Sequence, residues 1–459
     1  MVIDMPEKVR FIIDTLLEHG HEAYAVGGCV RDAILGREPG DWDITTSAKP
    51  QQVKTLFRRT IDTGIQHGTV TIMLNKEGFE VTTYRIDGEY EDSRHPKSVE
   101  FTTNLVEDLK RRDFTINAMA YNHITGLVDE FNGIEDLKKK RIVCVGNPME
   151  RFDEDALRML RAVRFSGQLG FTIDEDTKRA IVKLAPTIQN ISRERIRVEI
   201  DKLICSDNCE KLEDAYHIGL TNYIFPELGR MFETEQNNPH HKYNVGTHCL
   251  KAVDYFNKEI KASDAYKSCG FDKKMDSVLC WTLLLHDIGK TVTKTTDEAG
   301  INHFKGHDSE GQRMAAKVLK GLKFDNFTID TASRIIKWHD YRYESSDEAV
   351  RRALNKIGVN LIYPLLIVQY ADIMAQSDYQ LEEKTARLKN AAEKIREIFQ
   401  KHQCVTMKEL AVNGRDLMEI GFKPGRVIGE TLQKLLDLVI ENPDKNEKEI
   451  LLEKARSYK

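Results

Sequence analysis

The order of apolar and polar positions changes character near residue 145. Before that point, short segments with alternating or continuous apolar residues and many β-branched side chains predict strands; these are AYAV, DWDITT, TVTIML and FEVTTYR. Residues 6–19 instead repeat apolar side chains at the spacing of one helix face. The pattern therefore predicts a small unit of mixed strands and helices at the start of the chain.

Helical spacing dominates from about residue 150 onward. FDEDALRMLRAVRF, IDEDTKRAIVKLAP and SRERIRVEIDKLICS place apolar residues three and four positions apart. The polar stretch ETEQNNPHHKYN predicts a boundary, and a charged helix is expected at residues 380–400. We therefore expect an α+β fold, with a mixed head followed by an all-α neck, body and tail. The expected domains are 1–145, 146–235, 245–377 and 380–459.

Composition limits the class of protein but does not indicate which reaction it catalyses. Hydrophobic residues make up 41% and charged residues 31%, as in helix-rich globular proteins. No apolar run approaches the roughly 20 residues that span a bilayer, and MVIDMPEKVRFIIDTL lacks the features of a signal peptide. We therefore expect a cytoplasmic protein with no membrane partner. The net charge of −5 argues against nonspecific coating of nucleic acid but allows a local basic groove.

The segment GGCVRDAILGREPGDWDIT combines three features that suit phosphate chemistry. Gly27 and Gly28 follow a predicted strand and precede a predicted helix, so backbone N–H groups can approach phosphate oxygens there, and Arg31 lies just inside that helix. Asp41 and Asp43 alternate on the next predicted strand, so their carboxylates point to the same side. Two aligned carboxylates suit a pair of Mg²⁺ ions, and Glu80 on a neighbouring strand is placed to complete the site.

This joint pattern resembles the nucleotidyltransferase fold shared with DNA polymerase β. It resembles most closely the class II tRNA CCA-adding enzymes and bacterial poly(A) polymerases. RRDFTINAMA, FDEDALRMLRAVRF and ERIRVE look like the hinge, the nucleotide-selecting helix and the brace of the neck in that family. The resemblance implies contacts to triphosphate or ribose from Gly28, Arg31 and Arg112. It also implies that Asp155 and Arg158 read the incoming base, with Arg161 and Arg164 behind them.

The chemistry of the bases agrees with this assignment. On a helix, Asp155 and Arg158 would share a face. Cytosine and adenine both offer an exocyclic amine beside a ring-nitrogen acceptor, so the carboxylate can accept from the amine while the guanidinium donates to the ring. Uracil and guanine would turn a carbonyl toward the carboxylate, which costs roughly 1–3 kcal/mol for each unpaired polar group.

The sequence indicates the family more clearly than it indicates which of the family's activities the chain has. Residues 85–101 resemble a flexible loop that CC-adding enzymes lack, and residues 63–72 resemble the CCA-adding branch. We therefore expect addition of C, C and A to the 3′ end of tRNA from CTP and ATP, with an A-adding specialist and a poly(A) polymerase as alternatives. Residues 413–429 resemble the family's C-terminal segment, which would contact the tRNA or simply pack as two helices.

A second pattern lies in the helical half. LLLHDIGK places a His-Asp pair at the end of an apolar helix. The order of His248, His286, Asp287 and Asp372 resembles the HD superfamily of metal-dependent phosphohydrolases, and it implies a divalent transition metal on these four side chains. Three further histidines would bind a second ion or phosphate: His303, His307 and His339.

Two alternatives of another class remain open at this point. The first is an HD phosphohydrolase whose head only recognises RNA, and the second is an RNA-binding protein without catalysis. Asp41, Asp43, Asp155 and Arg158 argue against both, because binding alone needs no metal-ligating carboxylates.

Overall fold

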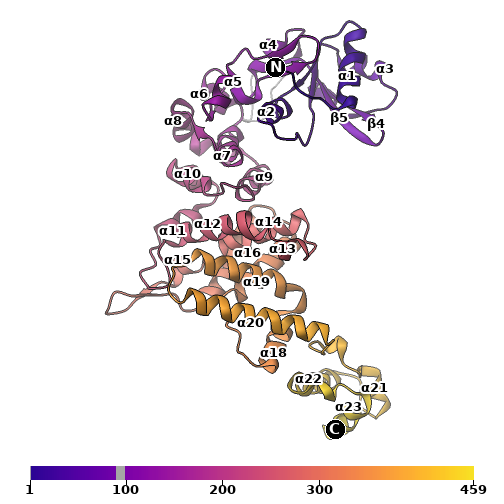
Figure 1. Ribbon diagram of the computed structural model, residues 1–459, viewed down its shortest axis with the longest axis vertical. Helices are drawn as coiled ribbons and strands as arrows, with labels where there is room; N and C mark the ends of the chain where they lie inside the picture. The colour runs from indigo at the N-terminus through magenta and orange to yellow at the C-terminus, as the bar shows by residue number, and fades with distance from the viewer. Residues whose placement is uncertain (1, 89–98, 459) are drawn as a thin grey trace. The chain divides into compact units, whose positions relative to one another are not determined.

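The computed structural model describes residues 2–88 and 99–458, and the chain divides into two compact units, Met1–Gly229 and Arg230–Lys459 (Figure 1). The boundary falls within helix α11 (Pro226–Glu233). The finer division into four domains stays a prediction. Residues 89–98 of the expected flexible loop lie outside the described residues.

A seven-stranded mixed sheet organises the first unit, with strand order β3-β4-β5-β2-β1-β8-β9. β2 and β5 pair in parallel, and the other neighbours in this sheet pair antiparallel. The strands are β1 (Ala23–Val26), β2 (Ile44–Thr46), β3 (Thr60–Gly64), β4 (Thr69–Leu74), β5 (Glu77–Thr83), β8 (Ala120–Asn122) and β9 (Gly126–Val128). Two small pairs accompany it: β6 (Arg85–Asp87) with β7 (Val99–Phe101), and β10 (Arg141–Ile142) with β11 (Thr172–Ile173).

Helices complete the first unit (Figure 1). They are α1 (Glu7–Glu18), α2 (Gly28–Ile34), α3 (Pro50–Leu56), α4 (Leu105–Lys110), α5 (Gly133–Lys138), α6 (Pro148–Glu154), α7 (Leu157–Leu169), α8 (Glu175–Leu184), α9 (Arg193–Ile204) and α10 (Lys211–His217). The prediction of an amphipathic helix at 6–19 is confirmed by α1, which buries Val9, Ile12, Ile13 and Leu16. α7 packs against α9.

The second unit is built from helices apart from one short hairpin, β12 (Thr295–Thr296) with β13 (Asn302–His303), among the residues that the structure describes. Its helices are α12 (Val245–Tyr255), α13 (Asp264–Lys267), α14 (Lys273–Leu285), α15 (Lys290–Thr293), α16 (His307–Gly321), α17 (Asn326–Trp338), α18 (Asp347–Ile357), α19 (Ile362–Ala375), α20 (Leu381–Gln400), α21 (Gly414–Glu419), α22 (Arg426–Glu441) and α23 (Lys448–Arg456). The charged helix expected at 380–400 is α20. The α+β fold class is thereby confirmed.

Helix α14 forms the centre of this unit. It is buried from Val278 to Leu285, and it packs against α12, α17 and α19. A stretch of helix buried on all sides must be largely apolar around its circumference, which explains why Val278–Leu285 shows no polar face after the exposed, polar first turn of α14. The His-Asp pair follows directly at its C-terminal end, so these polar side chains enter the interior from the last turn of a core helix.

Membrane-spanning segments were sought among the described residues. No single helix there is both long and apolar enough to cross a bilayer. Two consecutive helical segments, Asp347–Ile357 and Val359–Ala375, have the length and apolar composition of a membrane span only when taken together, and the chain bends by 93° between them.

Candidate active and metal sites

A glycine turn and an arginine form one wall of the candidate active site in the first unit. Gly27 has a φ of +84° and ends β1 before α2 begins. A Cβ at this position would lie 3.0 Å from Nη1 of Arg112, so the turn needs glycine and Arg112 lies over it. Nε of Arg112 is buried and forms no hydrogen bond with the described residues. This donor and the turn fit an anionic ligand such as a triphosphate.

The two aspartates lie beside this turn. Asp41 and Asp43 stay exposed in the segment directly before β2 rather than on the strand itself, because the β2 ladder begins only at Ile44. Asp43 is open to solvent on one side, but the protein around its carboxylate displaces enough water to raise its pKa; the charge of Arg112 opposes that shift, and the charge of Asp41 adds to it. The three charged groups therefore act on one another, and two adjacent carboxylates fit a divalent cation.

Glu80 is less closely placed than the sequence suggested. Ile44 pairs with Val81 across the parallel β2–β5 ladder, so Asp43 and Glu80 precede paired residues on neighbouring strands. However, the groups of three or more metal-ligating side chains found within 4.8 Å among the described residues do not include Asp41, Asp43 and Glu80 together. The role of Glu80 as a third carboxylate stays a prediction.

The expected helix through Asp155 and Arg158 is broken at Asp155. This residue has extended backbone (φ −142°, ψ 101°) between α6 and α7. Its Oδ1 accepts a hydrogen bond from the backbone N–H of Leu157 at 3.1 Å, as an aspartate commonly does at a helix start. Its Oδ2 accepts from Nη2 of Arg195 on α9 at 2.8 Å. The carboxylate is thus fixed from two sides by partners that the helical pattern did not reveal.

Arg158 is also fixed, from the first turn of α7. Its guanidinium donates to Oε2 of Glu154 at 2.5 Å, to the backbone carbonyl of Arg111 at 2.9 Å and to that of Arg151 at 3.1 Å. Asp155 and Arg158 therefore lie close in sequence but are held by different partners. An arrangement this constrained suits recognition, because little side-chain freedom remains to be lost on binding.

The other arginines that the sequence indicated as nucleotide-binding residues form hydrogen bonds and ion pairs within the protein. Arg31 is buried and donates to Oδ1 of Asn117 at 2.6 Å and to Asp32. Arg161 pairs with Asp113 at 2.6 Å, and Arg164 is buried and pairs with Glu199 on α9. Burial alone would raise the pKa of Asp113, but Arg161 and Asn117 outweigh it and lower that pKa to about 2.

In the second unit, the structure brings the four expected HD side chains together. Oδ1 of Asp372 lies 2.9 Å from Nε2 of His248 and 3.4 Å from Nε2 of His286. Oδ2 of Asp287 lies 3.3 Å from the same nitrogen of His286 and 3.6 Å from that of His248. His248, His286 and Asp287 are almost completely buried.

These side chains fit a metal ion. Nε2 of His286 is buried and forms no hydrogen bond with the described residues, although it points at two carboxylates. Nδ1 of His286 and Nδ1 of His248 face the backbone carbonyls of Leu283 and Ala375, so the proton belongs on Nδ1 and the lone pair on Nε2. Two imidazole lone pairs and two carboxylates around one point form a ligand set for a divalent transition metal.

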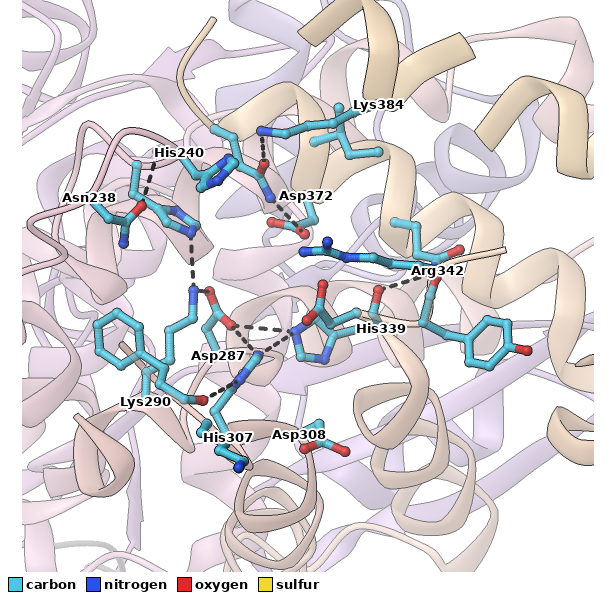
Figure 2. A pocket seen from close by; sticks show the side chains of 18 of the residues that line it. Asn238, His240, Asp287, Lys290, His307, Asp308, His339, Arg342, Asp372 and Lys384 are labelled. Carbon is cyan, nitrogen blue, oxygen red and sulfur yellow. Dashed lines mark hydrogen bonds and ion pairs between the residues drawn. The ribbon is translucent and has the colours of Figure 1, made fainter. Parts of the chain in front are cut away.

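The three further histidines separate into two groups. His307 and His339 lie against Oδ1 of Asp287 (Figure 2), whereas His248 faces Oδ2, and the side chains of Asp287, His307 and His339 can together hold one ion. His303 does not join them: its exposed side chain pairs with Asp297 on the β12–β13 hairpin at 2.7 Å. The hairpin carries it away from the buried centre.

Two residues near this centre were not recognised as site residues from the sequence. Nζ of Lys290 lies 2.7 Å from Oδ2 of Asp287 and 3.3 Å from Nε2 of His241. Burial and the charge of Lys290 lower the pKa of His241 to about 2, so this imidazole is neutral. His241 belongs to the polar stretch that the sequence presented only as a boundary, and nothing in its spacing indicated a place beside a metal centre.

Comparisons with known proteins address the identity of both units. Residues 23–143 match the family model "Poly A polymerase head domain", residues 170–231 match "Probable RNA and SrmB- binding site of polymerase A", and residues 307–455 match a model for tRNA nucleotidyltransferase domain 2. The chain is 35% identical to the CCA-adding enzyme of Limosilactobacillus reuteri over 454 residues, which cover 98% of this chain and 96% of that one.

Solved structures give the same result. The Bacillus stearothermophilus CCA-adding enzyme in complex with CTP superimposes with a TM-score of 0.72 at 31% identity, covering 98% of both chains. The Thermotoga maritima CCA-adding enzyme complexed with tRNA has a TM-score of 0.56 at 20% identity over 99% of this chain and 95% of that one, a likeness of fold alone. The comparisons leave the resemblance to HD phosphohydrolases a prediction. Because the identity to full-length relatives extends over nearly the whole chain, the protein belongs to the family of CCA-adding enzymes, which are tRNA nucleotidyltransferases.

Proposed function

We propose that this chain adds C, C and A in order to the 3′ end of tRNA, using CTP and ATP. The relatives named for CTP and tRNA complexes support the substrates. The arrangement of the Gly27 turn, Arg112, Asp41 and Asp43 carries the proposal, because it places two exposed carboxylates near an arginine whose Nε forms no hydrogen bond with the described residues, although its Nη2 pairs with Asp108 at 3.6 Å. That combination suits a nucleoside triphosphate with divalent cations.

The residues would divide the work as follows. Asp41 and Asp43 would hold two Mg²⁺ ions, which when bound lower the barrier to attack by the RNA 3′-hydroxyl and stabilise the pyrophosphate. Arg112 and the backbone of the Gly27–Gly28 turn would orient the triphosphate. The 3′-hydroxyl loses its proton to solvent and its oxygen forms a bond to the α-phosphorus, while the bond from that phosphorus to the bridging oxygen breaks and pyrophosphate leaves with the electron pair.

Base selection would rest on Asp155 and Arg158. Asp155 is held by Arg195 and by the first backbone N–H of α7, and Arg158 is held by Glu154. Arg31, Arg161 and Arg164 would act indirectly, since their guanidinium groups are paired within the protein. They would set the position of α2 and α7 rather than contact the nucleotide.

The double substitution Asp41→Asn with Asp43→Asn tests the proposed catalytic site. Losing the charge that holds the ions should lower the rate of nucleotide addition by at least about 10³-fold. Incorporation of labelled CTP into tRNA lacking its terminal CCA measures this rate. Asp62→Asn is a suitable control, because Asp62 is an exposed carboxylate of the same unit that pairs only with Lys54 in the described contacts. Undiminished addition in the double variant would remove these aspartates from the mechanism.

A second candidate function belongs to the HD cluster. We propose that His248, His286, Asp287 and Asp372 bind a divalent transition metal and support hydrolysis of a phosphoester. Nε2 of His286 favours this over a purely structural cluster, because it is buried, forms no hydrogen bond with the described residues and faces the carboxylates of Asp287 and Asp372.

Metal analysis tests this site: the full chain carrying Asp41→Asn and Asp43→Asn, which removes the proposed Mg²⁺ ligands, is stripped with a chelator, reloaded with Mn²⁺ or Co²⁺ and desalted. Bound metal is expected, and His286→Gln with Asp287→Asn should abolish it. No bound metal in the parent protein would overturn the site.

A further inference from the structure

Large side chains gather on the outward face of helix α19. Tyr363, Ile367, Tyr370 and Met374 recur at intervals of three and four residues, so they share one face of this helix. Tyr363 and Tyr370 are each 39% exposed, whereas most of the other residues of α19 are buried. Exposed aromatic residues in a row are typical of an interaction surface.

Helix α12 continues this face. It packs against α19, and the rings of Tyr255 and Tyr370 meet edge to face with their centroids 6.0 Å apart. Lys251 lies one turn before Tyr255, and Lys258 follows in the helical segment Phe256–Ile260. Both lysines are exposed. The two helices therefore present tyrosines and lysines on one continuous surface.

The surface is hollowed beside Tyr255. A pocket of about 240 Å³ is lined there by the lysines of α12, by Lys242 and Tyr243 from the loop before that helix, and by Met374 near the end of α19. Nζ of Lys242 lies 5.5 Å from the centre of the Tyr243 ring. Lys242 and Lys251 form no ion pair within the described part of the chain, so their charges are available to an anion.

Two acids line the same pocket without cancelling its positive charge. Asp254 pairs with Lys258 at 2.6 Å, so these two groups largely neutralise each other. Glu259 then remains against the charges of Lys242 and Lys251. The surface is therefore modestly basic, which suits a partner that it holds at a small number of anionic groups.

We infer that the outward faces of α12 and α19 form an RNA-binding surface of the second unit. Lys242 and Lys251 donate to phosphate oxygens of the RNA, and Tyr370 and Tyr363 lie against its ribose rings or unpaired bases. The inference rests on the proposed function, because it takes tRNA as the RNA that is bound.

The combination of residues favours RNA over a protein partner. RNA offers phosphates to lysine, and it offers riboses and unpaired bases to aromatic rings. A tyrosine hydroxyl can also donate to a phosphate or 2′-hydroxyl oxygen. Lysine, in contrast, is depleted from the cores of protein–protein interfaces. A two-fold dimer through this face would also bring the same lysines of both copies toward one another.

The surface shares no residue with the proposed nucleotide site. Every residue of α12 and α19 belongs to the unit that begins at Arg230, whereas Asp41, Asp43 and Arg112 belong to the other unit. The lysines and tyrosines would thus add affinity for the RNA without contacting the incoming nucleotide. Their loss should change the binding of tRNA and not that of CTP.

Equilibrium binding of the full chain to tRNA lacking its CCA, measured without nucleotides at several salt concentrations, tests the surface. In Lys242→Gln with Lys251→Gln, Kd should rise about 5–20-fold at low salt, and the slope of log Kd against log salt should fall by about 2, one for each lost phosphate contact. Lys317→Gln with Lys320→Gln is the matched control. It removes the same charge from exposed positions of α16 in the same unit, so Kd and slope should not change.

The outcomes separate this surface from the proposed function. A parent chain that does not bind the tRNA would contradict both. Binding in the parent that the Lys242/Lys251 variant retains, with the same salt slope, would overturn the surface alone. An equal loss of binding in the Lys317/Lys320 control would show a general effect of net charge and would likewise overturn the assignment to this face.

The tyrosines are tested in the same binding measurement. Tyr370→Ala should raise Kd about 5–20-fold with little change in salt slope, because stacking involves no counterion release, whereas Tyr370→Phe keeps the ring and should retain most of the affinity. Circular dichroism checks that each variant is folded, and Tyr363→Ala replaces Tyr370→Ala if the latter unfolds. Unchanged binding without the ring would remove the aromatic row from the surface.

Steady-state incorporation of CTP supplies an independent readout. In the Lys242/Lys251 variant, KM for tRNA should rise by about the same factor as Kd, while KM for CTP keeps its parent value. A rise in KM for CTP with no change in KM for tRNA would contradict an RNA-binding role for this face.

Discussion

Arg195 holds one oxygen of Asp155 while the start of α7 holds the other. The contact to Nη2 of Arg195 measures 2.8 Å, and that to the N–H of Leu157 measures 3.1 Å. A carboxylate oxygen has a second lone pair beyond each of these bonds, which leaves it able to accept from a base amine. In this account Arg195 is a positioning residue, since it would act on the nucleotide only through Asp155.

Replacing Arg195 should therefore change the choice of base more than the folding of the chain. In Arg195→Met, loss of a charge-assisted hydrogen bond, worth about 1.5–3 kcal/mol, should lower the preference for CTP over UTP by roughly 10–100-fold. Misincorporation with each single nucleotide measures this preference. Arg195→Lys should recover part of it. Arg193→Met is the matched control, because Arg193 donates to the carbonyl of Ile224 instead. An unchanged preference in Arg195→Met would show that Asp155 needs no support from α9.

At the scale of elements, Gly289 lets the turn that follows His286 and Asp287 pack closely against α16. A Cβ at Gly289 would lie 2.1 Å from the carbonyl oxygen of His307 and 2.6 Å from the backbone nitrogen of Gly311. Its φ of −63° is open to any residue, so the requirement for glycine is close approach and not backbone strain. This approach keeps Asp287 and His307 in one cluster.

Gly289→Ala should force these two segments apart. We expect the free energy of unfolding to fall by about 1–3 kcal/mol, as in other overpacked interiors, and the metal content of the HD cluster to fall with it. Urea unfolding and metal analysis measure the two effects. Gly321→Ala is the control: Gly321 ends α16 and has open space where a Cβ would lie, so this substitution should be nearly neutral. Full stability and full metal content in Gly289→Ala would contradict the role given to this contact.

Element periodicity explains what the sequence could and could not predict. The strand before the glycine turn and the helix at 6–19 follow from local patterns, and the structure confirms them; the strand after the turn begins only at Ile44, later than its pattern suggested. The break at Asp155 was missed because the apolar residues of FDEDALRMLRAVRF keep a helical spacing on both sides of it. The contact that fixes Asp155 comes from Arg195 on another helix and leaves no trace in the local sequence. The separation of His303 from His307 and His339 was missed because it depends on a hairpin and on the packing of α16 against α17.

At the scale of the whole molecule, the two candidate chemistries belong to different units. Asp41 and Asp43 lie in the unit that ends at Gly229, and the HD cluster lies in the unit that begins at Arg230. Each site is assembled from residues of its own unit. Substitutions at one site are therefore expected to leave the intrinsic chemistry of the other intact, which is why the metal measurement can use a protein without its proposed Mg²⁺ ligands.

The most direct test of the account is nucleotide incorporation into tRNA that ends before its CCA, with CTP and ATP supplied separately and together. The account predicts C, C and A in that order with both nucleotides, only C with CTP alone, and arrest after a single A. Addition of A only to tRNA already ending in CC would mark an A-adding specialist. Long A tails would mark a poly(A) polymerase. Either result, or no incorporation at all, would contradict the account.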